Sequence, residues 1–119
     1  MSEVKEMTIE DVIATCKKNN RRADTKLIRK AYEFAKAHHG DQLRKSGEPY
    51  IVHPVQVAYI LSTLSLDDST ICAALLHDTV EDTDVTKQDI AEQFSPEIAE
   101  LVDGVTKLSK LQYASMEEQ

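Results

Sequence analysis

The most restrictive feature of this sequence is how rarely it contains residues that interrupt a helix. Only three glycines and three prolines occur in 119 residues, so the chain has few points at which a regular segment must end. Between these points, apolar residues recur with the three- and four-residue spacing of an α-helix, and no alternating pattern of useful strand length occurs. The sequence therefore predicts an all-α helical bundle in a single domain, residues 1–119.

Capping residues divide this pattern into six expected helices. Thr8 and Asp11 have the spacing of a capping box, and Asp24 stands directly before a second apolar stripe. The fourth helix is expected to begin after Asp67 or Asp68, since either side chain can accept hydrogen bonds from the first turn. In chain order, the expected helices cover about residues 9–16, 25–40, 54–61, 68–81, 87–94 and 96–107.

Charge and cysteine content narrow the class of protein. The formal net charge of −7 argues against nucleic-acid binding, which needs a clustered basic surface. Cys16 and Cys72 lie in apolar helical patterns and do not form a metal-type pair, so both are expected to be reduced core residues. The sequence contains no run of 18 apolar residues and no signal-peptide pattern at its start. We expect a cytoplasmic protein that does not bind a membrane.

The segment from Ala73 to Thr83 carries most of the ionisable chemistry. On a helix of 100° per residue, with His77 at zero, Glu81 falls at about 40°, Asp78 at about 100° and Asp82 at about 140°. The residues that face away from these groups, from about 160° round to about 300°, are Cys72, Leu75, Leu76, Thr79 and Val80. This helix is therefore expected to have an apolar back and an acidic, histidine-bearing front.

Three carboxylates on neighbouring turns repel one another, and a divalent cation removes that repulsion. Histidine together with carboxylate suits Mn²⁺, Fe²⁺ or Zn²⁺ better than Ca²⁺ or Mg²⁺, which prefer shells of oxygen ligands. The alternative interpretation is a solvated acidic helix end, because a His-Asp dipeptide alone is common.

His53 strengthens the metal interpretation. It lies 24 positions before His77, next to Pro54 at the start of an expected helix, and a hairpin of two helices would bring the imidazoles together. Taken alone, it is equally typical of a histidine at a helix start. His38 and His39 end the second expected helix, where positive side chains suit the helix dipole, and a metal role is the lesser alternative for them.

Three motifs carry a resemblance to a known family. RKSGEPYIVHP (residues 44–54), HDTVEDT (77–83) and LVDGVTKL (101–108) resemble, in order and spacing, the hydrolase motifs of RelA/SpoT homologues. The resemblance covers nearly the whole chain. It implies an all-helical HD-type fold that holds one Mn²⁺.

The same resemblance implies roles for individual residues. It makes His53, His77 and Asp78 metal ligands, and Glu81 and Asp82 the catalytic acidic pair. It also implies substrate-binding residues in the loop before the third expected helix: Arg44, Lys45, Ser46 and Tyr50. Without the resemblance, Arg44 and Lys45 are typical of solvated loop cations, and Tyr50 is equally suited to pack under a pocket.

The function implied by the resemblance is hydrolysis of the 3′-diphosphate of guanosine 3′-diphosphate 5′-(di/tri)phosphate, the alarmone (p)ppGpp, to GDP or GTP and pyrophosphate. The parent enzyme would act in the stringent response and would also be a GTP pyrophosphokinase, with synthetase and regulatory domains in cis. Two alternatives stay open. One is an HD phosphohydrolase for another nucleotide, and the other is a catalytically incomplete nucleotide-binding or regulatory module.

One departure from the family pattern matters. The fourth protein ligand of the family is an aspartate in a later helix, within a D-R-L-H-N type motif, and no such motif occurs before Gln119. We therefore expect that the chain is the N-terminal part of an HD hydrolase domain from a longer protein. By itself it is expected to be inactive and to bind metal weakly.

Overall fold

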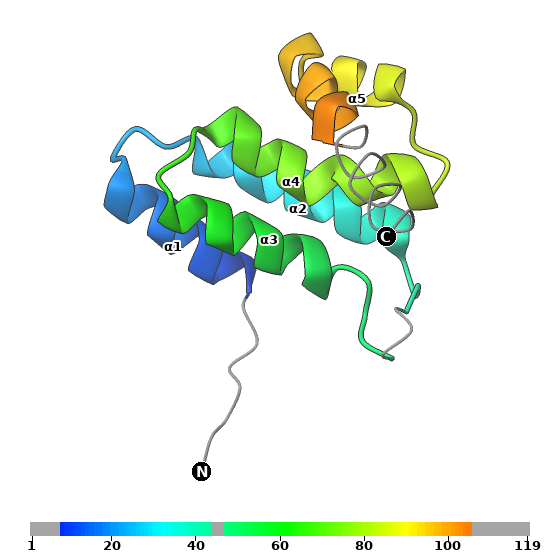
Figure 1. The fold of residues 1–119 in the computed structure, drawn as a ribbon, viewed down its shortest axis with the longest axis horizontal. Coiled ribbons are helices and arrows are strands. Elements are labelled where there is room, and N and C mark those ends of the chain that lie inside the picture. Colours follow the sequence, from blue (N-terminus) through cyan, green and yellow to red (C-terminus); the bar gives the residue numbers. More distant parts are fainter. Residues whose placement is uncertain (1–7, 44–46, 106–119) are drawn as a thin grey trace, which may run out of the picture.

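The computed structural model describes residues 8–43 and 47–105. Its helices are α1 (Ile9–Asn19), α2 (Thr25–His39), α3 (Val52–Thr63), α4 (Asp68–Asp82) and α5 (Lys87–Gln93) (Figure 1). Residues 96–105 are helical as well. Within the described ranges, β-structure is limited to an isolated antiparallel bridge between Leu43 and Pro49. The all-α prediction is confirmed.

The helices begin where short-range chemistry requires. Thr8 and Asp11 form the expected capping box at the start of α1. The Asp24 side chain accepts a hydrogen bond from the Leu27 N–H at the start of α2. The ambiguity at the fourth helix is resolved in favour of Asp67, whose carboxylate caps α4. Each of these caps satisfies backbone N–H groups that a helix start leaves unpaired.

Helix α4 is the central element of the bundle. It packs against α2 on one side and α3 on another, and α1 packs against both α2 and α3. All nine residues from Ile71 to Thr79 are buried. The ionisable front of α4 is therefore buried together with its apolar back as far as Thr79, because neighbouring elements cover this part of the helix. Only its last residues, Glu81 and Asp82, are exposed.

Helices α3 and α4 form an antiparallel hairpin, which positions the candidate site. The connection of residues 64–67 turns sharply at Ser65, whose φ of 61° lies in the left-handed region. In Figure 1 the two helices run side by side, so the start of α3 lies beside the end of α4. Helix α5 and residues 96–105 lie beyond the four-helix layer, over α4.

The apolar core confirms the assignment of the two cysteines. Cys16 and Cys72 are both buried and unpaired. They belong to a continuous cluster that contains Ile28, Leu75 and Val102. No helix in residues 8–43 or 47–105 combines the length and the apolar character needed to cross a membrane.

Candidate metal centre

His53 enters the site from the first turn of α3. Its backbone N–H donates to the Tyr50 carbonyl at 3.3 Å, and the preceding Val52 N–H donates to Pro49. These bonds start the helix two residues before Pro54, which occupies the first turn, where a missing N–H is tolerated. The half-buried His53 ring is thereby directed from a rigid helix start.

His77 enters from the second-last turn of α4, and its tautomer is fixed by the backbone. The ring Nδ1 lies 2.8 Å from the Ala74 carbonyl oxygen. A carbonyl can only accept, so Nδ1 must carry the proton and donate it. In neutral His77 the lone pair therefore lies on Nε2, the arrangement that metal-binding histidines require.

The antiparallel hairpin brings the predicted ligands together. The ring centroids of His53 and His77 are 6.5 Å apart, with the ring planes inclined by 62°. One ligand atom from each of His53, His77 and Asp78 lies within 4.8 Å of the others. Two nitrogens and one carboxylate oxygen thus converge from two helices, a set that suits a divalent transition ion.

The hydrogen-bonding capacity of His77 and Asp78 is not satisfied by the described protein groups. Nε2 of His77 and Oδ1 of Asp78 are 3.1 Å apart, although both are acceptors while the imidazole is neutral. The other oxygen, Oδ2 of Asp78, is buried and has no hydrogen-bond partner. Buried carboxylate oxygens are nearly always satisfied, so a cation bound at this point would satisfy an oxygen that the described protein groups leave without a partner.

The electrostatics of His77 and Asp78 without a metal also favour positive charge beside the Asp78 carboxylate. Burial opposes the charged form of His77, but the hydrogen bond and negative charge of Asp78 outweigh it and raise the pKa of the imidazole above 6.5. Burial also opposes ionisation of Asp78, yet the hydrogen bond from His77 and the charges of His53 and His39 hold its pKa below 3.8. The site therefore favours an ionised carboxylate facing positive charge.

The predicted acidic pair lies one turn further along α4. Both Glu81 and Asp82 are exposed, in contrast to the buried His77 and Asp78. The helical projection predicted only that the four groups share one side of the helix, and the structure adds that they differ in exposure. Two are buried at the hairpin and two reach solvent at the helix end.

The predicted substrate-binding residues fall in two groups. Arg44, Lys45 and Ser46 lie outside the described residues. Tyr50 is half-buried, and its hydroxyl donates a hydrogen bond to Oδ2 of Asp82.

The sequence did not predict the positions of two further residues in this region, His39 and Gln42. His39 was interpreted as a positive group at the end of α2, yet it is 2% exposed and its ring stacks on that of Tyr50. Gln42 donates through Nε2 to the Asp82 carbonyl at 3.0 Å. The only signal for His39 was its spacing of four from the buried Ala35 and eight from Ala31, which places it on the inner face of α2.

Comparisons with known proteins agree with this geometry. A model of the HD domain family matches residues 31–119. The chain is 58% identical to a guanosine-3′,5′-bis(diphosphate) 3′-pyrophosphohydrolase of Aquifex aeolicus over 88 residues, 74% of this chain and 13% of the relative. It is 56% identical to a GTP pyrophosphokinase of Myxococcus xanthus over 87 residues, 73% of this chain and 12% of the relative. A probable GTP pyrophosphokinase of Mycobacterium leprae is 46% identical over 110 residues, 92% of this chain and 14% of the relative.

Proposed function

The chain belongs to the HD domain family, within the group formed by the hydrolase regions of RelA/SpoT homologues, and on this premise we propose that it contributes the metal centre of a (p)ppGpp hydrolase. The reaction is hydrolysis of the 3′-diphosphate, which yields GDP or GTP and pyrophosphate. The convergence of His53, His77 and Asp78 within 4.8 Å is the observation that carries the proposal. We propose Mn²⁺ as the ion, because the resemblance to RelA/SpoT homologues implies it; the donor set of two imidazole nitrogens and a carboxylate suits Mn²⁺, Fe²⁺ or Zn²⁺.

The ion, when bound, would polarise the phosphoryl oxygens and lower the pKa of the attacking water. The residues of this chain hold the site in shape. The Ala74 carbonyl fixes the orientation of the His77 ring through Nδ1, and the first turn of α3 fixes His53. Helix α4 thus carries two ligands on adjacent residues, and the hairpin supplies the third.

The carboxylates at the end of α4 are proposed to handle the proton. Water forms a bond to the phosphorus attached to the 3′ oxygen, and the bond between that phosphorus and the 3′ oxygen breaks. One proton of the attacking water passes to Glu81 or Asp82, and the 3′ oxygen leaves as a hydroxyl after taking up that proton from the carboxyl group or a proton from solvent water. Both carboxylates are exposed, which leaves them accessible to a substrate that is not enclosed by the helices.

The proposal extends to segments and partners that the chain does not itself contain. The chain spans only 12% to 14% of the length of the relatives described above. We propose that it is the N-terminal part of an HD hydrolase domain in a longer cytoplasmic enzyme, with synthetase and regulatory domains in cis. The fourth metal ligand would then lie beyond Gln119. The loop residues Arg44, Lys45 and Ser46 are proposed to contact the nucleotide.

The test is turnover of ppGpp by the full-length enzyme with Mn²⁺, in ¹⁸O-labelled water. We expect GDP and pyrophosphate, with the label in pyrophosphate, because water attacks phosphorus. His77→Ala and Asp78→Ala should each abolish turnover, while His38→Ala, at an exposed position, serves as the matched control. Absence of ppGpp turnover, or turnover only of another nucleotide, would contradict the proposed substrate. Full turnover after either substitution would contradict the metal assignment.

A further inference from the structure

We infer that His39, Gln42 and Tyr50 form a clamp that fixes the carboxylate of Asp82, and that Tyr50 acts in the proposed hydrolysis as a positioning residue. The inference rests on the proposed function, because that function gives the Asp82 carboxylate a role in proton transfer, for which its position matters. It is carried by contacts between α2, the loop that follows it and the end of α4. The sequence places these residues up to 43 positions apart, between His39 and Asp82.

The first contact is between Tyr50 and Asp82. The tyrosine hydroxyl donates directly to Oδ2 of the carboxylate. Asp82 is the last residue of α4 and is exposed, so its side chain would otherwise sample several rotamers. A catalytic carboxylate needs one defined orientation toward the proton that it accepts. The hydroxyl supplies this restraint through a hydrogen bond to a charged group, one of the stronger kinds.

The second contact holds Tyr50 itself. Its ring stacks on the ring of His39, with the centroids 4.6 Å apart and the planes inclined by 17°. His39 is 2% exposed, so one of the two stacked rings is fixed in the interior of the bundle. A half-buried tyrosine ring on such a platform has little freedom to turn, and its hydroxyl keeps its direction.

The third contact joins the clamp to the backbone of α4. Nδ1 of His39 lies 3.0 Å from Oε1 of Gln42, and Nε2 of Gln42 donates to the Asp82 carbonyl at 3.0 Å. The two bonds are mutually consistent, because the amide oxygen accepts while the amide nitrogen donates. The Tyr50 N–H also donates to the Gln42 carbonyl at 3.0 Å. Side chain and backbone of Asp82 are therefore held by the same three residues.

The clamp has a consequence for Tyr50. The resemblance to RelA/SpoT homologues groups this residue with substrate contacts, but its hydroxyl is engaged with Asp82. Removal of the hydroxyl should therefore affect the proton-transfer step more than substrate binding. A substrate contact would show the opposite pattern, with a raised KM and an unchanged kcat.

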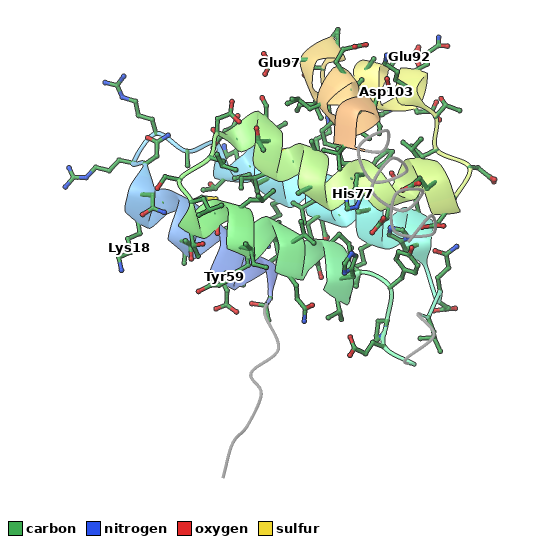
Figure 2. All side chains as sticks on the ribbon, viewed as in Figure 1. Lys18, Tyr59, His77, Glu92, Glu97 and Asp103 are labelled. Carbon is green, nitrogen blue, oxygen red and sulfur yellow. The ribbon has the colours of Figure 1, made fainter. Side chains whose placement is uncertain are left out.

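The experiment measures ppGpp hydrolysis by the full-length enzyme with Mn²⁺ for Tyr50→Phe, which keeps the ring and removes the hydroxyl. We expect kcat to fall about 10- to 100-fold, as for other groups that orient catalytic side chains, with KM changed less than about threefold. Gln42→Leu should show the same selective loss of kcat, and its exposed position makes it tolerant of replacement. Tyr59→Phe, on α3 away from His77 (Figure 2), is the matched control.

A double-mutant cycle separates positioning from general destabilisation. In an Asp82→Asn background, Tyr50→Phe should lower kcat by less than about twofold, because the group that it positions is already altered. Equal losses in both backgrounds, or a raised KM with unchanged kcat, would overturn the inference while the wild-type turnover still supports the proposed function. A wild-type enzyme without ppGpp turnover would instead overturn the proposed function.

Discussion

The α3–α4 hairpin has polar groups at both of its ends. At the far end these groups are paired with other protein groups, whereas at the near end a buried polar atom has no hydrogen-bond partner among the described residues. The far end comprises the end of α3 and the start of α4. There Asp67 caps α4, and Oδ2 of Asp68 accepts from the Asp24 N–H at 2.9 Å. The Asn19 amide donates to the Ser62 carbonyl at 2.9 Å. These groups join α2 to α4 and α1 to α3, and each satisfies another protein group.

The near end comprises the start of α3 and the end of α4. Among the residues that the structure describes, two buried side-chain atoms have no hydrogen-bond partner, Nε2 of His39 and Oδ2 of Asp78. Asp78 belongs to this end, and His39, at the end of α2, stacks on Tyr50 just before α3. The far end contains a hollow of about 180 Å³ lined by groups that cap and join the helices. The difference teaches that unsatisfied buried atoms distinguish the candidate ligand site from structural polarity.

The largest expected effect that tests the difference between the two ends of the hairpin is on metal affinity. Asp78→Ala removes a ligand at the near end, and we expect Mn²⁺ affinity of the full-length enzyme to fall by at least about 100-fold, more than for typical groups outside the ligand set. Asp68→Ala, on the same helix at the far end, should leave affinity unchanged. Calorimetric titration of both variants measures the contrast. Equal losses for the two substitutions would remove the distinction between the ends.

A smaller effect concerns stability at the far end. Asp67→Ala removes the hydrogen bond to the Thr70 N–H, 3.0 Å in length, and should lower the free energy of unfolding by about 1 kcal/mol. Mn²⁺ affinity should stay unchanged, since the cap lies at the opposite end of α4. Urea unfolding measures the loss, and Glu92→Ala, at an exposed position of α5, provides the control. A cap substitution without any loss of stability would show that the far end is not structural.

The smallest effect is the pH dependence of the metal-free chain. The raised pKa of His77 means that its contribution to stability is fully present below 6.5 and is lost as the pH rises through the folded-state pKa. The lowered pKa of Asp78 gives a contribution that is present above 3.8 and is lost as the pH falls through the folded-state pKa. The pair therefore stabilises the metal-free fold most between these two limits.

Urea unfolding in the presence of a chelator, at pH 5.5 and pH 8.5, measures this pH dependence of stability. We expect the stability difference between wild type and His77→Gln to be larger at the lower pH. A difference that grows toward the higher pH would show that the imidazole is not held charged beside Asp78. Binding of Mn²⁺ should show the reverse trend, because the ion and the proton compete for Nε2 of His77.

The sequence predicted the features that depend on local chemistry. Caps act over three or four residues, so spacing alone indicates those at Thr8 and Asp24, whereas at the fourth helix it left Asp67 and Asp68 as alternatives. The meeting of His53 and His77 followed from one further assumption, that consecutive helices form a hairpin. Both expectations are confirmed by the helix bounds and by the 6.5 Å between the ring centroids.

The sequence could not predict what depends on packing between distant segments. The burial of α4 on all sides arises from its contacts with α2 and α3, whereas a helical projection considers one helix in isolation. The bond between Tyr50 and Asp82 spans 32 positions, and the stack of His39 on Tyr50 requires α2 and the loop to fold back together. Neither contact produces a periodic signal.

The most direct test of the central claim is the paramagnetic effect of Mn²⁺ on the four histidine side chains of this chain. Nuclear magnetic resonance of the imidazoles during a Mn²⁺ titration reports distance from the ion even when binding is weak. The convergence of His53, His77 and Asp78 predicts that His53 and His77 broaden first and that exposed His38 broadens last. Loss of the His38 signal before those of His53 and His77, or equal broadening of all four, would contradict a metal centre at the hairpin.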